Sequence, residues 1–131
     1  MKKEISALIQ YRIKEAFETL EEAQILLKEG KTKGAMNRVY YGMFYATLAL
    51  LATKGLGAAK HSGVIALFHK EFVKTDIFPK GIAKYFAIAF DLRVKSDYRD
   101  FIIMEKENVE NLLKDAESFV NKAKEIINEM Q

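Results

Sequence analysis

The sequence predicts an all-α fold: an antiparallel bundle of four to five helices that forms a single domain over residues 1–131. Three observations predict it. Apolar residues recur at three- and four-residue steps through long segments, which is the period of an amphipathic helix. No segment shows the alternation of a strand, and the chain has one proline. A chain of this length can bury about two thirds of its unfolded surface in one core.

The first predicted helix runs from Glu4 to Lys28. Gly30 follows it and is expected to take the left-handed conformation that ends many helices. Thr32 is the predicted cap of the next helix. The recurring positions of the first helix are Ile5, Leu8, Ile9, Arg12, Ile13, Ala16, Phe17, Leu20, Ala23 and Leu27.

The second predicted helix, from about Lys33 to Lys54, is apolar nearly all round. Such a helix is buried on most sides, so we expect it to be the central helix of the bundle. Asn37, Arg38 and several tyrosine hydroxyls interrupt this apolar surface, and buried polar groups need partners. The helix therefore carries either an internal hydrogen-bond network or a binding surface. Its two stripes are Met36, Val39, Tyr40, Met43, Thr47 and Leu50, and Tyr41, Phe44, Tyr45, Leu48 and Leu51.

A third, shorter helix is predicted after Lys60–Gly63, with Ser62 as its cap. Pro79 suits the first turn of the fourth helix, which is predicted over about Lys80–Val94. Apolar side chains of the fourth helix fall on more than one side, so we expect it to be largely enclosed. These side chains are Ile82, Tyr85, Phe86, Ile88, Ala89, Phe90 and Leu92.

The last predicted helix, about Glu105–Met130, has a single apolar stripe. One-sided amphipathicity places it on the outside of the bundle, where we expect it to pack against the first helix. The apolar run Phe101–Met104 before it is expected to cover the end of the bundle. The stripe consists of Val109, Leu112, Leu113, Ala116, Phe119, Val120, Ala123, Ile126 and Ile127.

Composition bounds the class of protein. The formal net charge is +3, from 21 basic and 18 acidic residues, which is too small an excess to indicate nucleic acid by itself. Residues 54–84 are richer in lysine, although a solvated helix face explains most such runs. There is no apolar run of membrane-spanning length and no leader at Met1, so we expect a cytoplasmic protein. We expect no cofactor and no metal: cysteine is absent, and His61 and His69 lie eight residues apart rather than four.

One end of the bundle gathers residues suited to phosphate. If the third and fourth helices form an antiparallel hairpin, the start of one lies beside the end of the other. His61 then lies near Arg93 and the segment Lys95–Tyr98, and Lys54 and Lys60 converge there. Arginine binds phosphate bidentately, lysine adds charge, and histidine transfers protons near neutral pH.

The same residues also have structural explanations. His61 is equally well explained as a capping or solvent-exposed loop residue. Arg93 at a helix C-terminus is favoured by the helix dipole, and Asp91 or Asp97 can pair with it. Tyr98 can serve to pack the last turn. These alternatives stay open beside the phosphate site.

Three segments carry a family resemblance: AMNRVYYGMFYA at Ala35–Ala46, KHSG at Lys60–Gly63 and FDLRVKSDY at Phe90–Tyr98. Taken in order, they resemble the HEPN family (higher eukaryotes and prokaryotes nucleotide-binding domain). The first is similar to the family's small-x-[Ser/Asn]-Arg-x-Tyr-Tyr segment, and the last to its Leu-Arg-x-x-[small]-Asp-Tyr segment. Together with the helix order, the resemblance covers almost the whole chain.

The resemblance implies a helical bundle that commonly dimerises and is often encoded beside a minimal nucleotidyltransferase. It also implies a role in toxin–antitoxin, defence or RNA-processing systems. Many members are metal-independent ribonucleases, whose signature is an arginine followed, after four to six residues, by a histidine. The corresponding positions after Arg93 hold Tyr98, Arg99 and Asp100, so this signature is absent from the chain.

We therefore favour a binding or assembly module, a homodimer that holds RNA, a nucleotide or a partner nucleotidyltransferase, over an enzyme. The first alternative is a metal-independent endoribonuclease in which His61 takes a proton and Arg93 contacts the phosphate. Tyr98 is a poor base, because a tyrosine pKa of about 10 leaves it protonated at neutral pH. The second alternative is a purely structural dimerisation bundle. The candidate binding residues are Asn37, Arg38, Tyr41, Lys60, Arg93, Asp97 and Tyr98.

Overall fold

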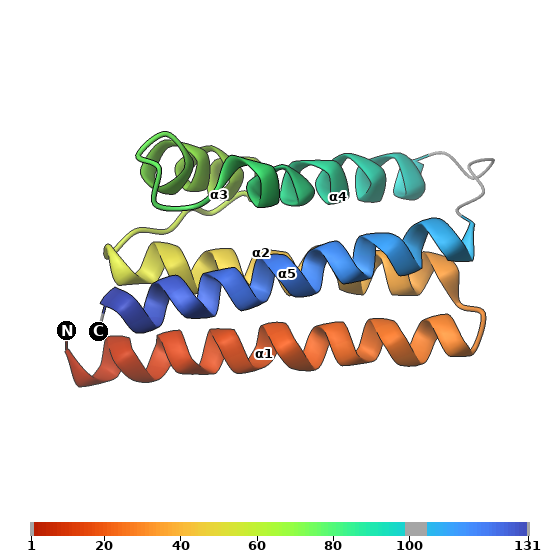
Figure 1. The fold of residues 1–131 in the computed structure, drawn as a ribbon, viewed down its shortest axis with the longest axis horizontal. Helices are drawn as coiled ribbons and strands as arrows, with labels where there is room; N and C mark the ends of the chain where they lie inside the picture. Colours follow the sequence, from red (N-terminus) through yellow and green to blue (C-terminus); the bar gives the residue numbers. More distant parts are fainter. Residues whose placement is uncertain (1, 99–104, 131) are drawn as a thin grey trace.

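The computed structural model describes residues 2–98 and 105–130, with the backbone alone for residues 96–98. These residues form helices and no strand, so the predicted all-α bundle is confirmed. In Figure 1, α2 and α5 lie between α1 on one side and α3 with α4 on the other. The expected covering segment, Phe101–Met104, lies outside the described residues. The elements are α1 (Lys3–Lys28), α2 (Thr32–Thr53), α3 (His61–Phe68), the π-helix η1 (His69–Val73), α4 (Lys80–Tyr98) and α5 (Lys106–Met130).

Glycines end the first two helices. Gly30 and Gly55 have φ angles of +74° and +70°, a region that side-chain-bearing residues rarely adopt. After α1, the N–H of Lys31 donates to the carbonyl of Leu26 at 2.8 Å and the N–H of Gly30 donates to Leu27 at 3.1 Å. This is the Schellman pattern, so the predicted role of Gly30 is confirmed.

Two predicted N-caps are wrong. Lys31 rather than Thr32 precedes α2, and Lys60 rather than Ser62 precedes α3; neither cap makes a side-chain hydrogen bond to its helix. Thr32 and Ser62 lie inside the helices that they were expected to cap. In proteins most of the stability of a helix comes from packing of its apolar face, so these two helices can form without a side-chain cap.

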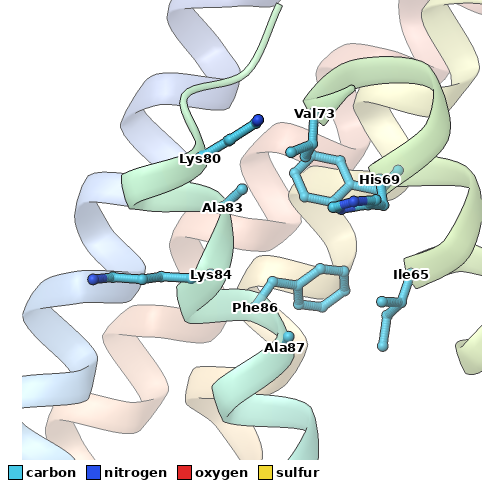
Figure 2. Close-up of a pocket in the computed structure, with 9 residues that line it drawn as sticks. Ile65, His69, Val73, Lys80, Ala83, Lys84, Phe86 and Ala87 are labelled. Carbon is cyan, nitrogen blue, oxygen red and sulfur yellow. The ribbon is translucent and has the colours of Figure 1, made fainter. Parts of the chain in front are cut away.

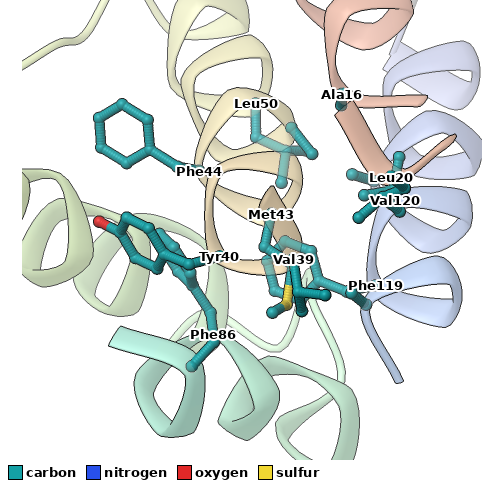
Figure 3. Close-up of a cluster of buried hydrophobic side chains, with 14 of the residues drawn as sticks. Ala16, Leu20, Val39, Tyr40, Met43, Phe44, Leu50, Phe86, Phe119 and Val120 are labelled. Atoms are coloured by element: carbon teal, nitrogen blue, oxygen red, sulfur yellow. The ribbon is translucent and has the colours of Figure 1, made fainter. Parts of the chain in front are cut away.

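Helix α2 is central, as predicted, and packs against α1, α3, α4 and α5. Figure 3 shows part of the resulting core. The crossing of α1 and α2 is close at Gly42, where an added Cβ would lie 2.4 Å from Cδ2 of Leu20. The missing side chain at Gly42 therefore sets the spacing of the two helices. The fully buried side chains of α2 include Met36, Val39, Tyr40, Met43, Leu50 and Leu51.

One side of α2 is less enclosed than predicted. Tyr45 and Leu48 are only half-buried. Charges on Arg12 and Glu15 of α1 act on the Tyr45 hydroxyl, so this part of α1 lies beside that side of α2. Leu8, one turn before Arg12 on the same face of α1, is 45% exposed. We refer to Leu8, Arg12, Glu15, Tyr45 and Leu48 as the α1–α2 face.

Helices α4 and α5 each bury one side. Helix α5 buries all nine residues of its predicted stripe, from Val109 to Ile127, and packs against α1, as expected. Helix α4 buries Phe86 and Ala89 but leaves Ile88 44% exposed. The expected enclosure of α4 is therefore wrong: it packs onto α2 and α5 along one side and leaves Ile88 to solvent.

Helix α3 continues directly into the π-helical turn η1. The N–H of Lys74 donates to the carbonyl of His69 at 2.9 Å, a bond that spans five residues. The Lys54 ammonium, at the end of α2, donates to the carbonyl of Glu71 at 2.7 Å and lies 4.7 Å from the centroid of the Phe72 ring. Lys54 thus joins the C-terminus of α2 to η1.

Candidate functional site

Two adjacent tyrosines on α2 connect the start of α3 with the end of α4. Tyr40 Oη and His61 Nδ1 lie 2.9 Å apart. Arg93 Nη2 donates a long hydrogen bond, 3.4 Å, to Tyr41 Oη. Arg93 Cζ also lies 5.2 Å from the centroids of both tyrosine rings, within cation–π distance. His61 and Arg93, from different helices, therefore contact the same pair of rings.

Arg38 brings a second guanidinium to this place. Three residues before Tyr41 on α2, it lies on the same helix face, and its Cζ is 5.2 Å from the Tyr41 ring centroid. Its Nη2 donates to Asn37 Oδ1 at 3.0 Å, and its Nη1 lies 3.5 Å from a carboxylate oxygen of Glu22 on α1. We refer to the group as the tyrosine cluster: Arg38, Tyr40, Tyr41, His61 and Arg93.

The His61 ring packs among aromatic rings of α2. Its centroid lies 5.7 Å from that of Tyr40, 5.6 Å from Tyr41 and 4.3 Å from Phe44, and the residue is half-buried. Burial lowers the pKa of His61 below its usual value, and the positive charge of Arg93 lowers this pKa further. The imidazole is therefore neutral at pH 7.

Tyr40 determines what the neutral imidazole can do. Figure 3 shows its ring leaving α2 on the side away from Leu20 and Val120. Burial raises the pKa of Tyr40 above its usual value, although Arg93 opposes the rise, so the hydroxyl stays protonated. When this hydroxyl donates to Nδ1, the His61 proton is on Nε2; when it accepts, Nε2 has a free lone pair. Only the second arrangement lets His61 take a proton from a ligand.

The two lysines expected at this site are placed differently. Lys54 does not reach the tyrosine cluster, because its ammonium is bound to the carbonyl of Glu71; the expectation that it converges with His61 is wrong. The end of α2 lies beside η1, at the far end of α3 from His61. Lys60 directly precedes α3 and is exposed.

On α4, Asp91 pairs with Lys95, whose Nζ lies 2.9 Å from Oδ2 of Asp91. This is a pair one helical turn apart on the surface of the helix. The side chains of Asp97 and Tyr98, both predicted as binding residues, lie outside the described part of the chain.

Three residues that belong to the tyrosine cluster or contact it were not identified from the sequence. Tyr40 and Phe44 were placed in the two apolar stripes of the second helix and not among the candidate binding residues, and Glu22 was not proposed for the site. Tyr40 carried a usable signal, because a tyrosine in a fully buried stripe needs a partner for its hydroxyl. Phe44 and Glu22 carried none, since their roles depend on how α1 and α3 pack beside α2.

The tyrosine cluster presents two guanidinium groups, one neutral imidazole and the half-buried ring of Tyr41, whereas the Tyr40 ring is fully buried. Guanidinium groups bind phosphate through paired hydrogen bonds, and aromatic rings stack with nucleic-acid bases. Within residues 2–98 and 105–130, no group of three or more His, Cys, Asp or Glu side chains is placed to hold a metal ion. None of the helices described has the length and apolarity needed to cross a membrane. The donor set of the cluster fits an anionic ligand with an aromatic part.

The fold and the cluster together define an all-α module whose central helix contributes to a partly exposed cluster of cationic and aromatic side chains. The sequence matches the HEPN domain over residues 9–127, and the chain belongs to the HEPN family. The family resemblance of the three sequence segments is therefore confirmed.

Relatives match over most of their lengths. A "UPF0332 protein" of Thermotoga maritima is 39% identical over 124 residues, which cover 95% of this chain and 94% of the relative. "Putative toxin MJ0142" of Methanocaldococcus jannaschii is 36% identical over 126 residues, 96% of this chain and 83% of the relative. A second toxin-named protein of that organism is 34% identical over 130 residues, 99% of this chain and 96% of the relative.

Proposed function

We propose that this HEPN domain is a binding module that holds RNA or a nucleotide by its phosphate at the tyrosine cluster. The observation that supports the proposal most directly is that the guanidiniums of Arg38 and Arg93 each lie 5.2 Å from the Tyr41 ring. Two cations from different helices thus flank one half-buried ring. Each guanidinium can bind phosphate oxygens through paired hydrogen bonds, and the partly exposed Tyr41 ring is an aromatic side chain of the kind that stacks with bases.

The present partner of Arg38 is replaceable. Its ion pair with Glu22 is 3.5 Å long, and the two side chains are 30% and 58% exposed. Ion pairs at such exposure contribute only about 0–1 kcal/mol. A dianionic or multiply charged phosphate ligand can therefore displace Glu22 at little cost, which makes Arg38 available to the ligand.

The fuller proposal concerns the assembly. The chain acts in the cytoplasm as a homodimer, in a toxin–antitoxin or defence system, together with a minimal nucleotidyltransferase. The toxin names of two relatives support the pathway. The α1–α2 face supports an assembly surface, because it leaves apolar side chains such as Leu8 and Leu48 incompletely buried.

A metal-independent endoribonuclease is the second candidate. The observation in its favour is that His61 and Arg93 contact the same two tyrosine rings. Cleavage requires a base for the 2′-hydroxyl proton, and a neutral His61 meets that need when Nδ1 donates to Tyr40. The third candidate, a purely structural bundle, expects His61 to face solvent, whereas its ring is half-buried against Phe44 and bonded to Tyr40.

Fluorescence anisotropy with a labelled single-stranded RNA and with a labelled ATP analogue, in EDTA, tests the proposal. Arg93→Ala and Arg38→Ala should each weaken binding about tenfold or more, the loss expected for a charge-assisted hydrogen-bond pair. Arg93→Lys keeps the positive charge but lacks the planar guanidinium that binds phosphate bidentately, so it should retain only part of the wild-type affinity. Lys114→Ala on α5 removes the same charge from another face and should have no effect.

The same samples are then resolved on denaturing gels. Intact RNA in the bound samples supports the binding module. Cleavage by the wild type that is lost in both His61→Ala and Arg93→Ala would replace it with the ribonuclease. Absence of RNA and nucleotide binding, or equal binding by Arg93→Ala and Lys114→Ala, would contradict the proposal.

A further inference from the structure

A cavity of about 260 Å³ lies between the α3–η1 segment and α4, and none of its lining residues belongs to the tyrosine cluster. Figure 2 shows the side chains that surround it. The inner wall consists of buried side chains: Phe68, Val73 and Phe86 are 3%, 3% and 1% exposed. The rim consists of exposed residues, among them His69 and Lys80. The cavity is therefore open at a polar rim and apolar inside.

Its size limits the occupant. Most small-molecule pockets measure ~300–1,000 Å³, so a cavity of about 260 Å³ accepts a short alkyl chain or a single ring. The wall offers aromatic and aliphatic carbon only, so burying a polar body there would cost free energy without a compensating hydrogen bond. The inner part of the ligand must be hydrocarbon.

The charged residues at the rim determine which head group the ligand can carry. No Asp or Glu is among the residues that line the cavity. In Figure 2 the Lys80 side chain extends from the start of α4 towards Val73, whereas that of Lys84 points away from the cavity. The Lys84 ammonium lies 5.7 Å from the centroid of the Tyr85 ring. Lys80 is thus the ammonium available at the opening, which the exposed His69 also lines.

The local backbone is an independent observation. The wall residues His69 and Val73 are the first and last residues of η1, and a five-residue hydrogen bond from Lys74 to His69 closes this turn. π-Helical turns are rare because their geometry is less favourable than that of an α-helix, and they occur frequently at functional sites. Here the π turn supplies one side of the cavity.

We propose that this cavity binds a small amphipathic carboxylate. The hydrocarbon part lies against Phe68 and Phe86, and the carboxylate lies at the rim beside the Lys80 ammonium. Burial of a short alkyl chain supplies the affinity, and Lys80 supplies the preference for a negative head group. The site is separate from the tyrosine cluster and does not depend on the function proposed there.

A titration of the ¹⁵N-labelled chain with octanoate, octanol and octylammonium, followed by amide chemical shifts, tests the inference. All three ligands carry the same chain, so only the head group differs. Octanoate should bind most tightly, with shifts concentrated in α3, η1 and the first half of α4. Equal affinity for the three, stronger binding of octylammonium, or no shifts in these elements would overturn it.

Two lysine variants test the contribution of the rim to binding, and a substitution of Ala87 tests the cavity itself. Lys80→Ala should weaken octanoate binding about two- to fivefold, the range of an exposed ion pair, and leave octanol binding unchanged. Lys84→Ala, whose ammonium faces Tyr85, is the matched control and should change neither. Ala87→Leu adds a side chain at the exposed edge of the cavity and should weaken both ligands. An unchanged octanoate affinity in Lys80→Ala would contradict the assigned rim, and unchanged binding in Ala87→Leu would contradict the assigned cavity.

Discussion

Tyr40 belongs to the hydrophobic core and to the candidate site at the same time. Its side chain is fully buried, and its ring centroid lies 5.7 Å from that of Phe86 on α4 in a stacked arrangement. Its hydroxyl is the atom that meets His61. The orientation of His61 is thus fixed by a residue that packing holds in place, which is the arrangement expected of a preorganised site.

The lowered pKa of His61 makes stability depend on pH. In the unfolded chain His61 titrates near its ordinary pKa of about 6.5, whereas in the folded chain its pKa is lower. Between the two values the unfolded state binds more protons, so the free energy of unfolding rises with pH. We therefore expect urea denaturation to show lower stability at about pH 5.5 than at about pH 7.5, and we expect His61→Gln to lose less on acidification than the wild type.

The chain contains a natural control for this experiment. His69 is its other histidine and is exposed on η1, so His69→Gln is the matched control for replacing a histidine by glutamine. If His61→Gln and the wild type lost the same stability between the two pH values, the proposed desolvation of His61 in the folded state would be wrong.

At the residue scale, sequence reasoning named groups better than it placed them. His61 and Arg93 were proposed from chemistry and helix order, and Tyr41 was named as a candidate binding residue beside the family resemblance; the structure brings the three together. Lys54 was proposed by the same reasoning but binds a carbonyl of η1 instead. A long, flexible side chain at a helix end reaches whichever acceptor packing brings near it, and its local sequence does not contain that information.

At the scale of elements, the α1–α2 crossing has no room for a side chain at Gly42. An added Cβ at Gly42 would meet Cδ2 and Cγ of Leu20 at 2.4 Å and 2.8 Å. Leu20 is 4% exposed and has little room to move in a packed interior. The two helices therefore remain close only while position 42 has no side chain.

Gly42→Ala should destabilise the fold even though alanine is the better helix former. The gain in helix propensity is at most about 1 kcal/mol, whereas overpacking of a core costs about 1–3 kcal/mol. We expect a net loss of up to about 2 kcal/mol in the free energy of unfolding, measured by chemical denaturation.

Gly34→Ala is the matched control in the same helix. Its Cβ would lie 3.5 Å from Cδ1 of Leu26, an ordinary contact, so propensity alone should act and stabilise the chain by up to about 1 kcal/mol. A Gly42→Ala variant as stable as Gly34→Ala would show that α1 and α2 can separate, contrary to the close crossing described here.

The elements themselves were predictable to different degrees. The nine-residue stripe of α5 follows from the sequence because a helix that packs on one side imposes a single period. The half-exposed side of α2 could not be predicted from the sequence. An apolar surface indicates burial but does not identify the element that covers it. The π turn was also missed, since a five-residue hydrogen bond has no distinct sequence period.

At the scale of the whole molecule, the α1–α2 face is where the proposed dimer would form. It lies along the central helix that also carries the tyrosine cluster, so a second copy docked there would stand beside the cluster. Tyr45 shows the mixed character of the face: burial and Glu15 raise its pKa, while Arg38 and Arg12 oppose the rise. Apolar and charged groups interleaved in this way are typical of protein interfaces.

Leu8→Glu tests this assembly without touching the core. Leu8 is 45% exposed, so a carboxylate there should leave the folded chain intact but replace an apolar contact in a dimer interface by a charge that must lose its hydration. We expect light scattering after gel filtration to show a dimer for the wild type and a monomer for Leu8→Glu. Ile25→Glu, at a 61% exposed position elsewhere on α1, should remain dimeric. A monomeric wild type, or equal masses for the two variants, would contradict a dimer through this face.

The overall architecture was predictable because five amphipathic segments joined by short links have few ways to bury their stripes. The packing of α5 against α1 followed from that argument, and Figure 1 shows the two helices along each other. The geometry of the tyrosine cluster did not follow, because it combines α2, α3 and α4 at distances that depend on how far each helix extends. Helix α4 continues to Tyr98, about one turn beyond its predicted end, and Arg93 lies within it rather than at its terminus.

The double role of Tyr40 has a consequence for how this family diverges. A lineage that no longer needs the ligand must still fill the space beside Phe86, so selection for folding alone will keep a large aromatic residue at this position. Arg38 is partly exposed and contacts Glu22, Asn37 and the Tyr41 ring rather than the core, so selection for folding alone constrains it less. In relatives, the arginine rather than the tyrosine will therefore record whether the binding site is still under selection.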